Sequence, residues 1–236
     1  MKATIKRGFA ITGLFIAISC TKENVAVATH KTNQQNLAQT VMLNDNLTGN
    51  AVLVTIGTQV WMQRNLNVGF YRNGDKIPQV KDPEAWSKLT TGAWCWHEND
   101  SAAGAVYGKI YNWYAVHDPR GLAPKGFHIP SNEEWTVLTT FLGGEAIAGG
   151  KMKEPGTAHW LAPNTNATNS SGFTGLAAGN RYNNGSFLYF GMYGWGWSST
   201  ANNAGAWYLR LNYNDGSVCR GQADKRDGIS VRCIKN

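Results

Sequence analysis

Hydrophobic and polar positions divide the chain into three stretches of different character. The first 19 residues begin with basic side chains and continue as an apolar run from residue 8. Residues 21–50 are mostly polar and poor in aromatic rings, whereas all ten Trp residues lie between Trp61 and Trp207. This pattern predicts a signal peptide at residues 1–19, a flexible tether at 20–50 and one globular domain at 51–236.

Runs of β-branched and apolar residues in the globular stretch predict its strands. Residues 51–56 form the first run, Gly57 turns the chain, and residues 59–62 continue the pattern. The Asn-Gly pair at residues 73–74 marks a tight turn. Beyond residue 173 the pattern is entirely that of strands, with hairpins expected over 181–187 and 207–220 and a last strand over 229–234.

The clearest helix signal begins at Ser131. Its hydroxyl can cap a helix while Glu134, three residues on, bonds back to the cap. Trp135 and two leucines then recur on one face at three- and four-residue spacing, until a Gly-Gly pair at 143–144 ends the pattern. A further helix is expected around residues 103–116. Helices early and antiparallel strands late indicate an α+β fold, rich in loops, with one or two helices.

The charge of the chain is mildly positive. The formal net charge is +7, from 22 basic and 15 acidic residues, and loss of the three basic residues in the signal peptide leaves +4. The basic residues form no run, so no nucleic-acid partner is expected. The N-terminal apolar run has about a dozen residues, fewer than the roughly 20 that a membrane-spanning helix needs, and no second long apolar run follows.

Cys20 directly follows the apolar run, after Ala17, Ile18 and Ser19. Small residues before a cysteine resemble a bacterial lipobox. That resemblance implies a lipid on the Cys20 thiol, cleavage before Cys20 and acylation of the new amino terminus, so that the membrane becomes a partner through the lipid anchor. The alternative is an ordinary signal peptide with an accidental cysteine.

Three further cysteines, Cys95, Cys219 and Cys233, are candidates for one disulfide. An export signal implies an oxidising path, in which disulfides form. Cys219 and Cys233 could face each other across a hairpin, or Cys95 and Cys233 could close a longer loop. Three thiols cannot all pair, and the sequence leaves the choice open.

Eight segments, taken in order, resemble one known family. They are 56–66 (IGTQVWMQRNL), 93–100 (AWCWHEND), 107–116 (YGKIYNWYAV), 122–131 (LAPKGFHIPS), 149–153 (GGKMK), 169–173 (NSSGF), 197–200 (WSST) and 230–235 (SVRCIK). Together they resemble the Fibrobacter succinogenes major paralogous domain, which occurs in secreted and lipid-anchored proteins of Bacteroidetes and Fibrobacteres. The resemblance covers about residues 50–236.

The family resemblance implies a C-type-lectin-like fold, akin to that of formylglycine-generating enzymes, in a cell-envelope protein. It implies no known reaction. The redox cysteine pair of those enzymes cannot be matched in this chain, and neither can the Glu-Pro-Asn or Gln-Pro-Asp triplet of calcium-dependent lectins. The implied location is the outer membrane, with lipid anchoring and exposure at the cell surface.

No segment carries a complete catalytic or metal-binding pattern. His97 lies beside Glu98 and Asp100, but a zincin helix needs two His residues four apart, and a polar turn is the simpler interpretation. Asn212, Asn214 and Asp215 lack the spacing of a calcium loop. We therefore expect no catalytic residue, no metal and no cofactor.

The segment over residues 180–205 is rich in Asn, Gly, Tyr and Trp. Adaptable amides beside rigid rings are typical of recognition surfaces, and the late loops of lectin-like folds bear the ligand site. The candidate ligand-binding residues are Arg181, Tyr193, Trp195, Asn202 and Asn203. Solvated loops without a ligand are the alternative. Separately, Ser101 lies in Asp-Ser-Ala, an O-glycosylation acceptor pattern of Bacteroidetes.

The sequence therefore predicts a non-enzymatic envelope lipoprotein whose domain binds a glycan or a protein, as a surface binding or adhesion module. Two alternatives stay open. One is a structural envelope protein without a small ligand, and the other is an enzyme on a lectin-like oxidase scaffold.

Overall fold

The computed structural model describes residues 40–45 and 49–236, with side chains described from residue 52 onward. Cys20 and the predicted signal peptide lie outside these residues. The strands are β1 (Thr40–Asp45), β2 (Gly49–Ile56), β3 (Gln59–Met62), β4 (Trp94–Cys95), β5 (Ile110–Tyr111), β6 (Phe127–His128), β7 (Asn180–Arg181), β8 (Phe187–Leu188), β9 (Tyr193–Ala201), β10 (Ala206–Asn212), β11 (Val218–Ala223), β12 (Ile229–Ser230) and β13 (Ile234–Lys235).

Short helices lie between the strands. They are α2 (Pro83–Ser87), the 3-10 helix η1 (His97–Asn99), α3 (Ser101–Tyr107), α4 (Trp113–Val116), α5 (Asn132–Phe141) and α6 (Glu145–Met152). Every pair of neighbouring strands in the sheets runs antiparallel. The predicted α+β class is confirmed, with more helices than the one or two expected. None of the helices in the described part of the chain is long and apolar enough to cross a membrane.

The largest sheet joins both ends of the described chain. Its order is β1-β2-β3-β13-β6, so the last strand of the chain lies between an early strand and a middle one. Ile234 of β13 pairs with Trp61 on one side and with His128 on the other. Strand β1 falls within the predicted tether, and the folded sheet therefore starts before residue 51.

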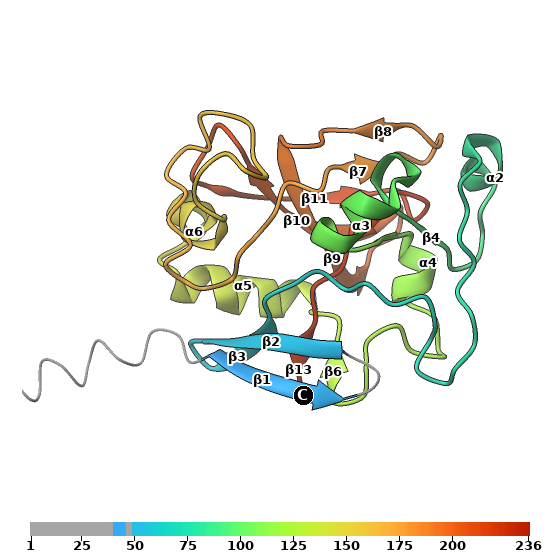
Figure 1. Cartoon of the computed structure of the whole chain (residues 1–236), viewed down its shortest axis with the longest axis horizontal. Helices are drawn as coiled ribbons and strands as arrows, with labels where there is room; N and C mark the ends of the chain where they lie inside the picture. The colour runs from blue at the N-terminus through green and yellow to red at the C-terminus, as the bar shows by residue number, and fades with distance from the viewer. Residues whose placement is uncertain (1–39, 46–48) are drawn as a thin grey trace, which may run out of the picture. The chain divides into compact units, whose positions relative to one another are not determined.

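A second sheet, of order β11-β10-β9, lies on the far side of helix α5 from the first sheet (Figure 1). Ser131 accepts a hydrogen bond from the Glu134 amide at the start of α5, and Glu134 accepts one from the Ser131 amide, so the predicted capping box is confirmed. Trp135 and Leu138 of α5 pack in one buried cluster with Trp61 of the first sheet and Leu209 of the second.

Glycines in β9 allow this close packing. A Cβ on Gly196 would lie 3.0 Å from the Trp135 ring, and a Cβ on Gly194 would lie 2.6 Å from the Leu176 carbonyl oxygen. At these two glycines, the side of β9 that faces α5 therefore has no room for a side chain. Trp195, between them, extends to the opposite side.

Two predicted elements are each divided in the structure. The helix expected around 103–116 is replaced by α3, β5 and α4, because Gly108 leaves α3 with a φ of 77° and Asn112 caps α4. The last strand expected over 229–234 is divided into β12 and β13. Between them the Arg232 side chain turns inward and donates to the carbonyl oxygens of Met62 and Gln63.

Candidate functional site

Aromatic side chains and one arginine gather on the side of β9 and β10 that faces away from α5. Arg210 of β10 lies directly opposite Trp195 of β9, and Tyr208, two residues before Arg210, shares its side of β10. We call this surface the aromatic face; it comprises Tyr182, Tyr189, Tyr193, Trp195, Tyr208 and Arg210. All six side chains are half-buried.

The rings of the aromatic face form a continuous row. Ring centroids are 6.4 Å apart for Tyr182 and Tyr189, 4.7 Å for Tyr189 and Tyr193, 6.0 Å for Tyr193 and Trp195, and 4.6 Å for Trp195 and Tyr208. These separations are typical of favourable aromatic pairs. The loop that carries β7 and β8 thus supplies one half of the row, and the sheet supplies the other half.

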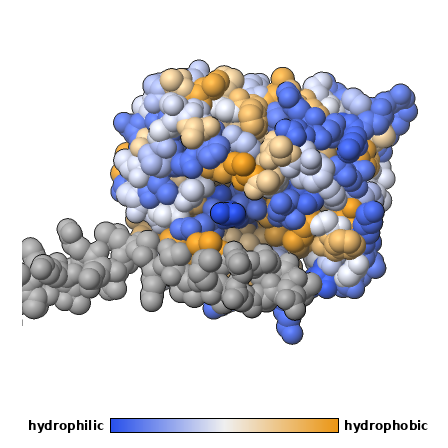
Figure 2. Space-filling view, viewed as in Figure 1, coloured by the Kyte–Doolittle hydropathy of each residue, from blue (hydrophilic) through white to orange (hydrophobic). Residues whose placement is uncertain are grey.

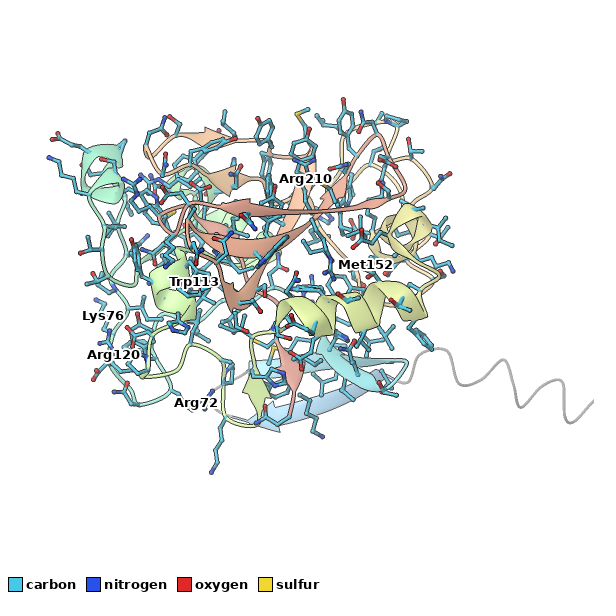
Figure 3. All side chains as sticks on the ribbon, turned by 180° about the vertical axis from the view of Figure 1, so that it is seen from behind. Arg72, Lys76, Trp113, Arg120, Met152 and Arg210 are labelled. Atoms are coloured by element: carbon cyan, nitrogen blue, oxygen red, sulfur yellow. The ribbon has the colours of Figure 1, made fainter. Side chains whose placement is uncertain are left out.

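Arg210 is the charged member of the row. Its guanidinium carbon lies 4.5 Å from the ring centroid of Tyr193 and 5.3 Å from that of Trp195, within the range of cation–π contacts. Its side chain makes no hydrogen bond or ion pair within the described part of the chain, and its Nε is buried. Figure 3 shows Arg210 on the sheet, well away from Arg72 and Arg120.

Trp195 supplies a second unpaired donor. Its indole Nε1 is buried without a hydrogen-bond partner among residues 52–236. Buried donors without partners are uncommon in folded proteins, and each one calls for an explanation. Two neighbouring unpaired donors beside a row of rings make this surface suited to a ligand with both polar groups and flat apolar faces.

Asp227 lies beside the aromatic face. A hydrogen bond with Tyr189 raises the pKa of Tyr182, burial raises the pKa of Tyr208, and the charge of Asp227 adds to both shifts. Burial raises the pKa of Asp227 itself to about 7, although the backbone amide of Asn183 donates to it. One of its oxygens, Oδ1, is buried and unpaired among the residues described here.

The family model described as the Fibrobacter succinogenes major domain matches residues 54–235. The chain belongs to this family. The match confirms the resemblance that the eight sequence segments indicate. No curated protein and no solved structure matches the chain.

In this Fibrobacter succinogenes major domain, two of the five predicted ligand-binding residues, Tyr193 and Trp195, lie together on the aromatic face. Arg181 lies elsewhere and is fully buried. Its guanidinium donates to the carbonyl oxygens of Gly185, Val80 and Lys81, and it stacks on Trp86 and Phe187. Arg181 therefore stabilises the fold and has no surface to offer a ligand.

Asn202 and Asn203 form the turn between β9 and β10, at the opposite end of β9 from Tyr193. The Asn202 side-chain oxygen accepts from the amides of Ala204 and Gly205, which makes it a turn residue. The turn chemistry of Asn explains its presence here. The structure does not bring these two residues to the aromatic face.

The sequence analysis did not identify three residues at the site. Tyr208 and Arg210 belong to the aromatic face, and Asp227 lies beside it. The alternation over residues 207–213 contained a signal, because Tyr208 and Arg210 are two apart and share a side of the strand. The pairing of Arg210 with Trp195 depends on the register of β9 and β10, which shifts near Ala206. That register cannot be read from the alternation of either strand alone.

The three candidate disulfide cysteines carry free thiols. Cys95 and Cys233 are buried in separate clusters, and burial raises the pKa of each to about 12. Cys219 is half-buried on β11, directly opposite Arg210 of β10. Because β11 pairs with β10, Cys219 and Cys233 do not face each other across a hairpin, which was one of the two open alternatives.

His97 and His128, in the described part of the chain, are both held by structural contacts. His97 is buried in the turn before α3 and stacks on Phe190, with ring centroids 4.5 Å apart. His128 lines an open groove of about 630 Å³, but its two ring nitrogens lie 2.8 Å from Glu134 Oε1 and Asn236 Oδ1. With both nitrogens occupied, His128 has none left to activate the Ser131 hydroxyl.

The other candidate sites in the described part of the chain are a metal site, a cavity and the serine of the glycosylation pattern. Residues 52–236 contain no cluster of three His, Cys, Asp or Glu side chains that could hold a metal. A cavity beneath Trp195, lined also by Leu209 and Arg232, has about 20 Å³ and fits about one water molecule. Ser101 is exposed at the first turn of α3, where Asp100 caps the helix.

Proposed function

We propose that this protein is a non-enzymatic binding module that recognises a glycan through the aromatic face. One observation carries the proposal: five adjoining rings with Arg210 and Trp195 among them, both with unpaired buried donors. Flat aromatic rings stack on the C–H faces of sugars, and the unpaired donors suit sugar oxygens. Asp227 would add an acceptor, or a donor when protonated, beside the row.

We also propose that the domain has a C-type-lectin-like fold and belongs to a lipoprotein of the cell envelope. Family membership and the antiparallel, loop-rich second half support the fold. The apolar run before Cys20 supports lipidation at that residue and anchoring to the outer membrane. In this proposal the lipid holds the protein at the membrane, while the domain binds its ligand at the cell surface.

A protein ligand is the second candidate. Figure 2 shows apolar residues interspersed with polar ones on one side of the molecule. Near the aromatic face, Phe190 and Leu188 are 42 and 40 % exposed, and Leu161, at 52 %, packs beside Gly191. Exposed apolar side chains of this kind favour protein contacts. The remaining alternatives, a structural envelope protein and an enzyme on an oxidase-like scaffold, have no comparable group of residues in their favour.

The test is binding of the purified full chain to a glycan array, followed by titration of each hit. Trp195→Ala should weaken binding of a hit by about 10- to 100-fold, or about 1.4–2.8 kcal/mol, since it removes a stacking ring and a donor. Trp207→Ala is the matched control, because Trp207 is also a half-buried Trp but its side chain leaves β10 on the other side.

Near-ultraviolet circular dichroism should show that both Trp variants remain folded. Equal losses for Trp195→Ala and Trp207→Ala would contradict the assignment of the site. An array without any hit from folded protein would contradict glycan recognition itself, and would favour the protein ligand.

A further inference from the structure

We propose that the ligand bound at the aromatic face carries an anionic group, a sugar carboxylate or sulfate, and that Arg210 binds this group. The inference rests on the proposed glycan-binding function and specifies the class of glycan. Other arginines near Arg210 differ from it because they contact acidic residues of the protein.

The other arginines on or beside this sheet each have a polar or acidic partner in the protein, and Arg220 also donates from one guanidinium nitrogen to Asn132 and Thr136. Arg226 forms a two-pronged contact with Asp224, at 2.7 and 3.0 Å. Arg220, one residue beyond Cys219, contacts Glu145 at 3.0 Å on the α6 side of the sheet. Arg210 has no acidic partner in the part of the chain that the structure describes, although its Nε is removed from solvent.

Asp227, the acidic residue beside the aromatic face, does not serve as that partner. It makes no hydrogen bond with Arg210, and the charged groups that act on the Asp227 carboxyl are those of Asp224 and Arg226. Burial raises the pKa of the Tyr208 hydroxyl, and both charged groups act on it as well: Arg210 opposes this rise and Asp227 adds to it. Arg210 thus has no ion-pair partner among residues 52–236.

The position of Arg210 suits an external anion. The rings of Tyr193 and Trp195 hold the guanidinium at 4.5 and 5.3 Å from their centroids, and they leave its N–H groups without acceptors. A guanidinium presents its donors as a planar fork that matches two oxygens of a carboxylate or a sulfate. Because the side chain is already ordered by the rings, binding an anion costs less conformational entropy.

The surroundings of Arg210 favour an acidic sugar over an acidic peptide. The neighbouring surface offers ring faces on both sides of the charge, with single unpaired polar atoms on Trp195 and Asp227 between them. A charged sugar presents flat C–H faces and hydroxyl groups together with its anionic group. A peptide carboxylate would use Arg210 but leave most of these ring faces without a matching partner.

The experiment measures binding of the full chain to matched probes by isothermal titration calorimetry. The carboxylate probes are oligogalacturonate and its methyl-esterified form, in which each carboxylate is a neutral methyl ester. The sulfate probes are a sulfated galactan oligosaccharide and the corresponding neutral oligosaccharide. A glutamate-rich peptide represents the acidic protein ligand. The variants are Arg210→Met, Arg210→Lys and the control Arg64→Met, which removes an exposed guanidinium outside the aromatic face.

We expect at least one charged oligosaccharide to bind ten-fold or more tightly than its neutral counterpart, and the pair that shows this identifies carboxylate or sulfate. Arg210→Met should abolish the preference, and Arg210→Lys should restore part of it. Arg64→Met should leave it unchanged, which separates a specific contact from the overall loss of one charge.

Three results would overturn the inference, and they are distinguishable. Equal affinity for charged and neutral sugars, unaffected by Arg210→Met, would refute the anionic group and leave glycan binding intact. Binding of the glutamate-rich peptide alone would assign Arg210 to a protein ligand. No binding of any probe by folded protein, together with an array without hits, would refute both the inference and the proposed function.

Discussion

Arg232 and Arg210 lie on opposite sides of the β9–β10–β11 sheet, and their surroundings differ in one respect. The guanidinium of Arg232 is 3 % exposed and donates to the carbonyl oxygens of Met62, Gln63 and Phe173 and to the Asn65 side chain. The guanidinium of Arg210 is half-buried between rings and donates to none of the residues described. Both contact aromatic rings, but only Arg232 has its donors satisfied.

This difference separates a structural arginine from an arginine that is available for binding. Arg232 connects β12, β3 and the segment after α6, so its hydrogen bonds belong to the folded state. Arg210 makes no hydrogen bond within the described residues, so it contributes little to the stability of the fold. Its Nε donor is desolvated and unpaired, which is unfavourable until a ligand supplies an acceptor. An arginine at such a position is best explained by the function of the surface that contains it.

The strongest way to test the comparison is to remove each arginine in turn. Arg232→Met should lower the free energy of unfolding by about 4 kcal/mol, because three buried carbonyl oxygens lose a donor at about 1–3 kcal/mol each. Arg210→Met should change it by less than about 1 kcal/mol, since no hydrogen bond is lost. Urea denaturation of both variants measures the difference, and similar losses for the two would contradict the separation.

The reactivity of the three cysteine thiols tests whether the aromatic face is more accessible than the protein interior. Cys219 should react with a maleimide reagent at least about 100-fold faster than Cys95 and Cys233, whose buried thiols with a pKa of about 12 react only after local opening. Mass spectrometry of digested samples over a time course identifies the labelled cysteine.

An anionic ligand bound at Arg210 should slow the labelling of Cys219, its neighbour across β10 and β11. Denatured protein, in which all three thiols react, is the control for labelling efficiency. Uniformly slow labelling in the native protein would mean that Cys219 is as inaccessible as the other two, and would count against an open aromatic face.

Local signals in the sequence were enough to locate some elements of the fold. The capping residues Ser131 and Glu134 set the start of α5, and the Gly-Gly pair after it set the end. The hairpins β7–β8 and β10–β11 were found from their turn residues. These predictions succeeded because a cap or a tight turn depends on a few neighbouring residues.

The predictions that failed depend on contacts between distant residues. Nothing within residues 229–234 indicates that Arg232 would bind carbonyl oxygens more than 150 positions earlier in the chain and so interrupt the strand. Arg181 was assigned to the ligand because of its Asn- and Tyr-rich neighbours, whereas its carbonyl partners Val80 and Lys81 lie 101 and 100 positions away. Tyr193 and Trp195 were found because composition alone marks a surface that is rich in rings.

Asp227 and Asp224 provide a smaller test, in which the two carboxyls should respond to pH in opposite ways. The pKa of Asp227 is raised to about 7 in the folded protein, so its contribution to stability is present below pH 4 and is lost as the pH rises through about 7. Asp227→Asn should remove this loss and stabilise the protein at pH 8 by about 2 kcal/mol.

Asp224 is the matched control for Asp227. Hydrogen bonds from Arg226 hold its pKa below the usual range, so its contribution is present above pH 4 and is lost as the pH falls. Asp224→Asn should therefore destabilise the protein at pH 8. Thermal unfolding between pH 4 and pH 8 measures both variants, and a destabilising effect of Asp227→Asn at pH 8 would show that its ionised form is favoured.

The smallest effect is expected at the turn between β9 and β10. Asn202→Ala should remove the acceptor for the amides of Ala204 and Gly205 and cost about 1 kcal/mol of stability. Asn203→Ala should cost less, since Asn203 is exposed. Neither change should alter ligand affinity by more than about two-fold, because the strand β9 separates the turn from Tyr193. Titration of both Asn variants with a ligand whose binding is weakened by Trp195→Ala tests this directly. A ten-fold loss of affinity for either Asn variant would extend the binding surface along the whole β9–β10 hairpin. An unchanged affinity would confine the binding surface to the end where Arg210 lies.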